Sequence, residues 1–393
     1  MAIAVVHGLV HAFSIFLSPL NDEIRRYFLA DSVSTVTAFK STYLATYAAS
    51  NLFFGMLTNR LSARKTLAAG LGVNGMAIAA FALVPPTGIG WMHALWLLAA
   101  VGGGVYHPVA NVLITRLYPE SKGRVLGFTG MGAAIGFALT PLMTTALAAL
   151  LGFEWQDVAL TFGLFGIVAS VWVYRVVRDT EAELSSQTAG SGGTVRTGFG
   201  ALSGIAGVLI AVILISGTRE MAMWSVLDIS DFFFLRVFGN TGRTGIYLFL
   251  LYAPGIVIQP LAGGLSDALG RRWLATVSFA LYGASVALAG IVPAGAIFIV
   301  YLGMGVGQAA TIPTVEAFVA DVAGPQLRGA AYGLFFTAGI ALGALGPGGT
   351  GALVDLMGGG LDAFRLVFAV LGGLVILAAC FTPFVITPRA EAR

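Results

Sequence analysis

The feature that most constrains the fold of this chain is its succession of long apolar segments. Twelve of them, separated by short polar or Gly/Pro-containing breaks, cover approximately residues 2–28, 34–58, 66–85, 92–117, 122–151, 155–177, 200–235, 243–266, 272–292, 295–320, 327–356 and 362–386. A helix of about 20 residues spans a bilayer, whereas transmembrane barrels consist of shorter segments of alternating hydropathy. We therefore predict an all-α polytopic membrane protein with twelve transmembrane helices. The seventh segment is long and carries charges, so we expect it to break or tilt.

Composition supports a membrane protein and excludes several other classes. Hydrophobic residues make up 58% of the 393 residues and charged residues only 10%, against about 25% charged in a soluble domain. The single cysteine, Cys380, allows neither an intrachain disulfide nor a cysteine metal cluster. No basic stretch suggests nucleic acid. The first apolar segment begins at Met1 without a basic leader, which predicts a retained helix and not a signal peptide.

The distribution of positive charge predicts the orientation. Twelve spans place both termini on one side, and with the N-terminus inside, the cytoplasmic loops hold Arg60, Arg64, Lys65, Arg116, Lys122, Arg124, Arg175, Arg178, Arg196, Arg271, Arg272, Arg328, Arg389 and Arg393. Only half as many Lys and Arg residues lie elsewhere, which favours cytoplasmic termini in the inner (plasma) membrane. The Ser/Gly/Thr-rich stretch 179–199 is typical of a flexible linker. It divides a six-helix bundle over 1–178 from a second over 200–393.

The two halves match each other. Pro119, Gly123, Gly127 and Pro141 of YPESKGRVLGFTGMGAAIGFALTP correspond, at one constant offset, to Pro325, Gly329, Gly333 and Pro347 of GPQLRGAAYGLFFTAGIALGALGP. A second matching pair lies earlier in each half, at GMLTNRLSARK (55–65) and GGLSDALGRR (263–272), with nearly the same offset. Two blocks in the same order indicate duplication of a six-helix unit, and therefore pseudo-twofold symmetry.

These motifs resemble those of the major facilitator superfamily. The loop after the eighth segment carries the glycine, acid, glycine and paired basic residues of that family, as Gly263, Asp267, Gly270, Arg271 and Arg272. The first copy keeps Arg60, Arg64 and Lys65, but Asn59 replaces the usual acid and Ser62 the usual glycine. Gly127, Gly132, Gly136 and Pro141 resemble the family's antiporter motif, with Thr140 where a glycine usually precedes the proline. The resemblance implies two bundles that rock around a central substrate site.

The same resemblance suggests a role for the basic loops. Asp267, Arg271, Arg272, Arg60 and Arg64 would form a conformational latch, by pairing with an acid or a helix C-terminus on the cytoplasmic side. The alternative is that these arginines only orient the protein. His7 together with the sequence Tyr-His-Pro at 106–108 resembles drug exporters of the fosmidomycin-resistance type. That type usually has an acid four residues after the first histidine, where this chain has His11.

Ionisable residues inside the apolar segments are candidates for function because a charge is costly in the bilayer. They are His7, His11, Lys40, His107, Arg219, Glu220, Asp228, Asp231 and Glu316. His7 and His11 share one helical face. In the family, the first and fourth spans line the cavity, so His107 would join them. Three imidazoles would handle protons or substrate, form structural hydrogen bonds, or bind Zn or Fe(II).

The remaining charges suggest an anion site and a proton site. Lys40 and Arg219, one from each bundle, would clasp a carboxylate or phosphonate, although Arg219 would otherwise pair with Glu220 or Asp231, and Lys40 would otherwise reach the outer surface. Glu316 is the best carboxylate for proton coupling, with a helix-to-helix hydrogen bond as the alternative. Tyr47 and Gln308 are weaker cavity candidates. We expect Asp228 and Asp231 to mark the wet outer end of the seventh span.

We therefore predict a monomeric secondary active transporter, not an enzyme. It would need no cofactor and no resident metal and would work by alternating access. A proton gradient would drive the export, by antiport, of a small organic compound or drug, and an anion is the favoured substrate. Substrate-binding candidates are Lys40, Arg219, His11, His107, Tyr47 and Gln308, and proton-coupling candidates are Glu316, His7 and His107. Three alternatives are proton-coupled uptake of an organic anion, carriage of a transition metal such as iron by the histidines, and an intramembrane enzyme with a histidine metal centre. The glycine-containing stretches GVNGMA and GTGALVD lack the lysine of a nucleotide-binding loop, so ATP-driven transport has no support.

Overall fold

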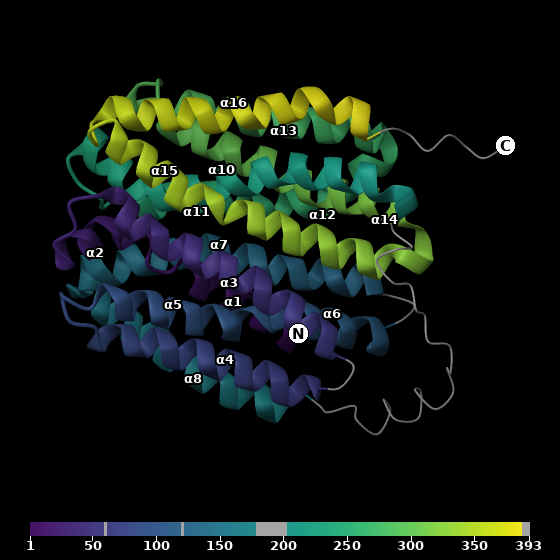
Figure 1. Cartoon of the computed structure of the whole chain (residues 1–393), viewed down its shortest axis with the longest axis horizontal. Coiled ribbons are helices and arrows are strands. Elements are labelled where there is room, and N and C mark those ends of the chain that lie inside the picture. The colour runs from purple at the N-terminus through teal and green to yellow at the C-terminus, as the bar shows by residue number, and fades with distance from the viewer. Residues whose placement is uncertain (59–60, 119–121, 178–202, 387–393) are drawn as a thin grey trace.

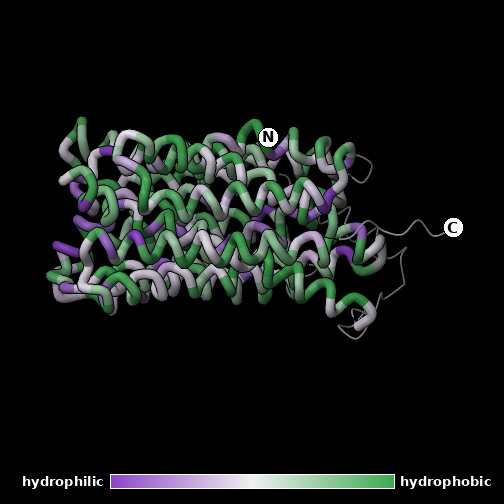
Figure 2. The backbone as a smooth tube through the Cα atoms, turned by 90° about the horizontal axis from the view of Figure 1, so that it is seen from above, coloured by the Kyte–Doolittle hydropathy of each residue, from purple (hydrophilic) through white to green (hydrophobic). Residues whose placement is uncertain are grey.

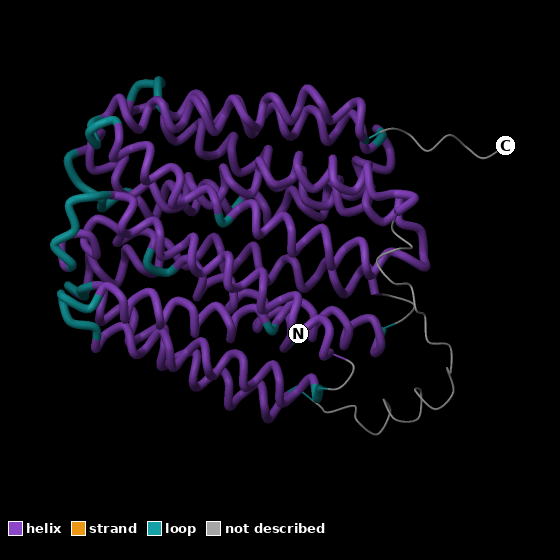
Figure 3. Tube along the Cα trace, in the orientation of Figure 1, coloured by secondary structure: helices purple, strands orange, loops and turns teal. Residues whose placement is uncertain are grey.

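The computed structural model describes residues 1–58, 61–118, 122–177 and 203–386. Every regular element in these ranges is a helix (Figures 1 and 3). The first half comprises α1 (Ala2–Ile15), η1 (Ser18–Leu20), α2 (Asn21–Tyr27), α3 (Val33–Leu57), α4 (Ala63–Ala80), η3 (Phe81–Leu83), α5 (Ile89–Gly104), α6 (Tyr106–Leu117), α7 (Lys122–Leu151) and α8 (Trp155–Val176). The second half comprises α10 (Ala206–Phe238), α11 (Thr244–Tyr252), α12 (Pro254–Leu269), α13 (Arg271–Ala289), η5 (Ala294–Ala296), α14 (Ile297–Gly343), α15 (Leu345–Leu356) and α16 (Leu361–Val385).

These elements form the predicted twelve spans. Eleven helical stretches of the described chain are long and apolar enough to cross a membrane. The twelfth span is α3, which has 25 residues but carries more polar side chains, including Lys40. Hydrophobic residues follow the helices along their length, and many of the hydrophilic ones gather at the two ends of the molecule (Figure 2). The first half forms one bundle and the second half another beside it (Figure 1).

Glycine and proline explain where the helices are interrupted. The fourth span changes from α5 to α6 at Val105, one turn before Pro108, which has no N–H to donate to the preceding turn. The eighth span divides in the same way before Pro254. The tenth and eleventh spans join in α14, with Gly324 at φ 64° and ψ 176° between them. For the seventh span we expected a break or a tilt, and the break is wrong, because α10 continues for 33 residues until Gly239.

The two bundles enclose a cavity that reaches one end of the molecule. We name this end, which holds Thr58, Tyr118 and Val177, the linker end; these three residues line the cavity. At the opposite end, which holds α2, the beginning of α3 and the end of α15, polar side chains of one bundle bond to the other. We name it the sealed end. The molecule is therefore open toward the side that we predict to be cytoplasmic.

Candidate functional site

The cavity between the bundles brings together most of the predicted site residues. It has a volume of about 2220 Å³ and is lined by both halves of the chain. His7, His11, Tyr47 and His107 come from the first bundle, and Arg219, Gln308 and Glu316 come from the second. Lys40 is the one predicted substrate contact that is not among the lining residues.

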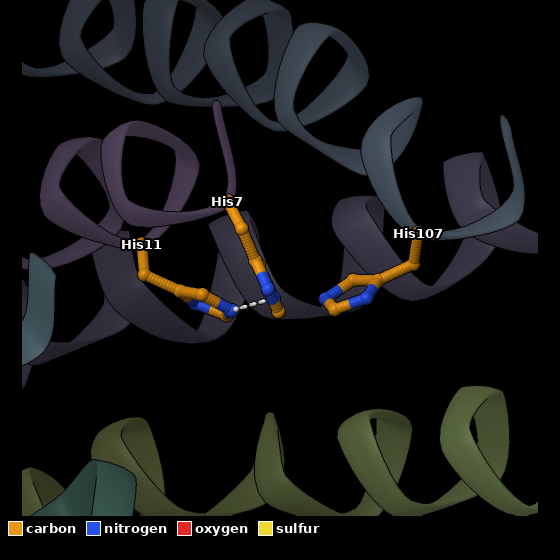
Figure 4. Close-up of side chains that lie close together, drawn as sticks. All are labelled: His7, His11 and His107. Atoms are coloured by element: carbon orange, nitrogen blue, oxygen red, sulfur yellow. Dashed lines mark hydrogen bonds between the residues drawn. The ribbon is translucent and has the colours of Figure 1, made fainter. Parts of the chain in front are cut away.

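The three histidines form one wall of the cavity, which we name the histidine wall (Figure 4). His7 Nδ1 lies 2.9 Å from the carbonyl oxygen of Thr129, and His11 Nε2 lies 3.1 Å from His7 Nε2. Because a carbonyl only accepts, Nδ1 of His7 carries its proton, and Nε2 of His7 accepts from His11. The ring centroid of His107 lies 4.9 Å from the ring centroid of His7 and 5.6 Å from that of His11. The predicted clustering of the three imidazoles is therefore confirmed, while their predicted part in proton coupling stays a prediction.

A close helix crossing positions the histidine wall. A Cβ atom at Gly8 of α1 would stand 2.7 Å from the carbonyl oxygen of Gly132 on α7, and one at Gly132 would run into the backbone of Ala4. Two glycines therefore let the backbones touch, as at close crossings in other membrane helices. This contact places the Thr129 carbonyl within reach of His7. Tyr106 stacks on His7 at 4.6 Å and Phe137 stacks on His11 at 4.4 Å, which fixes the two rings.

The second bundle contributes a charged wall. Arg219 forms an ion pair with the neighbouring Glu220, whose other carboxylate oxygen accepts from Nε1 of Trp224 at 3.1 Å. The pairing of Arg219 with Glu220 was one of the two alternatives that the sequence left open. Glu220 lines the cavity, and the sequence reasoning had not placed it in the site. The position of Glu220 next to an arginine inside an apolar segment is the sequence feature that could have identified it as a site residue.

Glu316 lies on α14 in the same charged wall. The charges of Arg219 and Glu220 act on its carboxyl group. Tyr332 donates a hydrogen bond of 2.9 Å to the backbone carbonyl of Glu316 and not to its side chain. Glu316 lines the cavity, so protons have access to its carboxyl group from there. Its coupling role stays a prediction.

Lys40 lies behind the cavity and does not join Arg219 in a common site. Its ammonium group donates to the carbonyl oxygen of Ser14 and lies 3.9 Å from Oδ1 of Asp228, which belongs to the other bundle. Only 4% of Lys40 is exposed, so it does not reach the outer surface either. The ring of Trp224 lies 5.9 Å from Nζ. Lys40 therefore contributes to contact between the bundles, and Arg219 alone of the expected pair lines the cavity.

The expectation that Asp228 and Asp231 are wet is wrong. Both are buried, with 2% and 0% exposed. Asp228 accepts from Ser18 at 3.1 Å, and Asp231 accepts from the backbone N–H of Asp22 at 2.9 Å. These partners belong to η1 and α2, in the other bundle. The periodic pattern could not show this, because it says nothing about which helices meet at the sealed end.

Asp355 adds a third contact across the sealed end. Its carboxylate accepts from the backbone N–H groups of Val33 at 2.7 Å and Ser34 at 2.9 Å. These are free donors of the first turn of α3, where the helix dipole also favours an anion. Ser41 of the same helix accepts from the backbone N–H of Gly348 at 2.9 Å. The end of α15 is therefore attached to α3.

Tyr47 and Gln308 both line the cavity, as expected. Nε2 of Gln308 donates to the carbonyl oxygen of Leu251 at 3.2 Å. The hydroxyl of Tyr47 and Oε1 of Gln308 are buried and have no partner in the described part of the chain. A polar group of a substrate or water would satisfy them.

The predicted latch residues form contacts within each bundle. Arg271 pairs with Asp267 at 3.2 Å and with Asp321 at 3.0 Å, both in the second bundle. Arg272 lies over Trp273, 5.2 Å from the ring. In the first bundle, Arg64 donates to the carbonyl oxygen of Tyr174 at 2.6 Å. Arg60 and Asn59, like Pro119 and the linker 179–199, lie outside the described residues. The role of these contacts as a latch stays a prediction.

One family model matches nearly the whole of this chain, and one curated relative matches part of it. The family model of the Major Facilitator Superfamily matches residues 3–253 and 235–393. An uncharacterised transporter of this type from Mycobacterium tuberculosis is 30% identical over 142 residues, which are 36% of this chain and only 24% of that protein.

Solved structures show the same fold. A bacterial homologue of the human lysosomal transporter Spinster, in an inward-facing and occupied conformation, aligns with a TM-score of 0.83 at 17% identity, over 98% of this chain and 95% of that one. A D-xylose–proton symporter aligns with a TM-score of 0.76 at 16% identity, over 100% and 98% of the two chains. The nucleoside transporter NupG aligns with a TM-score of 0.79 at 14% identity, over 98% and 99%. The chain is a multi-pass transporter, not an enzyme, and it belongs to the Major Facilitator Superfamily.

Proposed function

We propose that this protein is a proton-coupled secondary transporter of a small organic anion, with Arg219 as the anion-binding group and Glu316 as the proton-binding group. The observation that carries the proposal is the ion pair of Arg219 with Glu220 on the cavity wall. Arg219 already holds a carboxylate there, so the carboxylate or phosphonate of a substrate finds the same donors when Glu220 moves aside. The proposal replaces the clasp of Lys40 and Arg219 with a single arginine and an exchangeable carboxylate.

The charges of this wall favour binding of the proton and the anion in the same state. Arg219, Glu220 and Glu316 together carry one net negative charge when all three are ionised. A monoanion raises this to two, which disfavours binding unless a carboxyl group takes up a proton. Protonation of Glu220 would also release Arg219 for the substrate. By linkage, each ligand then increases the affinity for the other. Tyr332 on α14 is a further titratable group near Glu316.

Coupled binding of this kind corresponds to co-transport. The proton and the anion then enter the cell together, and the proton gradient drives the uptake of the anion. Proton-driven export is the second candidate, and the motif of His7 with Tyr106, His107 and Pro108 favours it by resemblance to drug exporters. Export requires that proton and substrate displace each other. The two functions therefore differ in the sign of their coupling. We propose the inner membrane with cytoplasmic termini as the setting for both, and a monomer as the working unit.

The sign of a pH change in proteoliposomes tests the proposal. Phosphonates, fosmidomycin among them, are added outside vesicles that contain pyranine and are clamped at zero membrane potential. Co-transport acidifies the lumen, and antiport makes it alkaline. We expect acidification that Glu316→Gln abolishes and that the exposed control Asp362→Asn keeps. Alkalinisation would establish the exporter instead, and phosphonate entry without any pH change would contradict proton coupling.

A further inference from the structure

We propose that His7, His11 and His107 form a binding site for a divalent d-block cation such as Zn²⁺. This inference does not depend on the proposed function, because it concerns the histidine wall and not the charged wall. One nitrogen of each ring lies within 4.8 Å of one nitrogen of each other ring. Nitrogen ligands of a tetrahedral Zn²⁺, at about 2.0–2.1 Å from the metal, are about 3.4 Å apart. His7 and His11 already meet this spacing, at 3.1 Å, so only His107 has to approach.

The contact of His7 with Thr129 is the arrangement that metal-binding histidines use. Such a histidine usually donates its other ring N–H to a carbonyl, which fixes the tautomer and directs the free lone pair at the metal. The Thr129 carbonyl oxygen occupies this position, 2.9 Å from Nδ1 of His7. The lone pair on Nε2 of His7 therefore points toward His11, inside the cluster. His11 becomes the second ligand when the proton on its Nε2 moves to its Nδ1.

The surroundings select the class of metal and leave one position open. Three neutral imidazoles suit Zn²⁺, Co²⁺, Ni²⁺ or Cu²⁺, whereas Mg²⁺ and Ca²⁺ require oxygen ligands. Tyr106 and Phe137 stack on His7 and His11 and hold their rings in place. All three histidines line the cavity, so a fourth coordination position faces it. Water or an oxygen of an anion can occupy that position, which makes the site exchangeable.

Co²⁺ binding to the purified full-length transporter tests this site. The protein carries an affinity tag without histidine, and Co²⁺ is titrated by calorimetry and by its visible absorption. We expect one equivalent of Co²⁺ with the absorption of a four-coordinate site, displaced by Zn²⁺. His7→Ala and His107→Ala should each weaken binding at least tenfold. The matched control is His93→Ala, since His93 lies outside the cluster and contacts Thr42 at 3.2 Å.

Two results would overturn the site. One is the absence of saturable Co²⁺ binding in the wild type, and the other is an equal loss of binding in His93→Ala. Because an alanine variant can misfold, a second measurement uses the unaltered protein. Electron paramagnetic resonance of one bound equivalent of Cu²⁺ should show hyperfine coupling to three imidazole nitrogens. Coupling to only one nitrogen would place the metal elsewhere and contradict the proposal.

Discussion

The two ends of this transporter differ in how the bundles meet. At the sealed end, Asp228, Asp231 and Asp355 of the second bundle bond to the first. At the linker end, the bundles are separated by the cavity, and the ion pairs of Arg271 stay within one bundle. Alternating access requires that the contacts of one end break when the other end closes. The contacts at the sealed end therefore stabilise the present conformation, in which the cavity is open at the linker end.

The difference also concerns burial of charge. Lys40 and Asp228 are both buried, so each charge requires the other as its partner. Arg219 and Glu220 form a similar pair, but on the cavity wall, where a ligand can replace one partner. One pair therefore joins the two bundles, and the other is available to the substrate. Both pairs are next to Trp224, which lies 5.9 Å from Lys40 and bonds to Glu220.

The largest effect is expected from breaking the buried pair at the sealed end. Asp228→Ala leaves the charge of Lys40 buried without its partner, which costs about 3–5 kcal/mol. We expect a lower apparent melting temperature in detergent and loss of transport. The double variant Lys40→Met/Asp228→Leu should recover most of the stability, since no charge is then buried. If Asp228→Ala melts like the wild type, the pair does not hold this end together.

The next effect concerns the pair on the cavity wall. Arg219→Ala removes a charge-assisted hydrogen-bond donor, which is worth about 1.5–3 kcal/mol. We expect phosphonate affinity to fall by about 10- to 100-fold, as measured by tracer binding or by the KM of transport, with little change in stability. Arg236→Ala is the control, because Arg236 bonds to the Gly359 carbonyl oxygen on the surface. Unchanged affinity in Arg219→Ala would remove this residue from the substrate site.

A smaller effect should follow from separating α1 and α7. Gly132→Ala places a methyl group against the backbone of Ala4, and such overpacking costs about 1–3 kcal/mol. The shift should lengthen the contact of His7 with Thr129 and weaken Co²⁺ binding. Gly127→Ala is the matched control on the same helix, since a Cβ there meets nothing within 4 Å. Equal Co²⁺ affinity in both variants would show that the crossing does not position the histidine wall.

The smallest effect is expected from the cap at the sealed end. Asp355→Ala removes the acceptor of two N–H groups at the beginning of α3, worth about 1–2 kcal/mol. This should shift the population toward the conformation that is open at the sealed end. Ser14, which lines the cavity, would be changed to cysteine in a Cys380→Ser background. A membrane-impermeant maleimide applied at the sealed end should then label this cysteine faster than in the protein with Asp355. Unchanged labelling would show that Asp355 does not help to close the sealed end.

Local patterns account for the parts of the fold that the sequence predicted. Helix length, the glycine and proline breaks and the internal repeat depend on neighbouring residues, so twelve spans in two bundles followed from them. His7 and His11 share a helical face for the same reason, and their four-residue spacing already placed them together. The continuous α10 was missed because charges inside a span can be paired by the other bundle, as Asp228 is, and need no break.

The amino-acid sequence by itself determined the membrane class, the helices, the duplication and the set of ionisable residues inside the spans. Only the tertiary structure decided which of them meet. Asp355 caps a helix that lies 322 positions earlier in the chain, and Asp228 bonds to Ser18 across 210 positions. Lys40 of the first bundle lies beside Asp228 of the second bundle and not beside Arg219. Such contacts depend on how two separately formed bundles dock, and on which end is closed, and no periodicity along one helix contains that information.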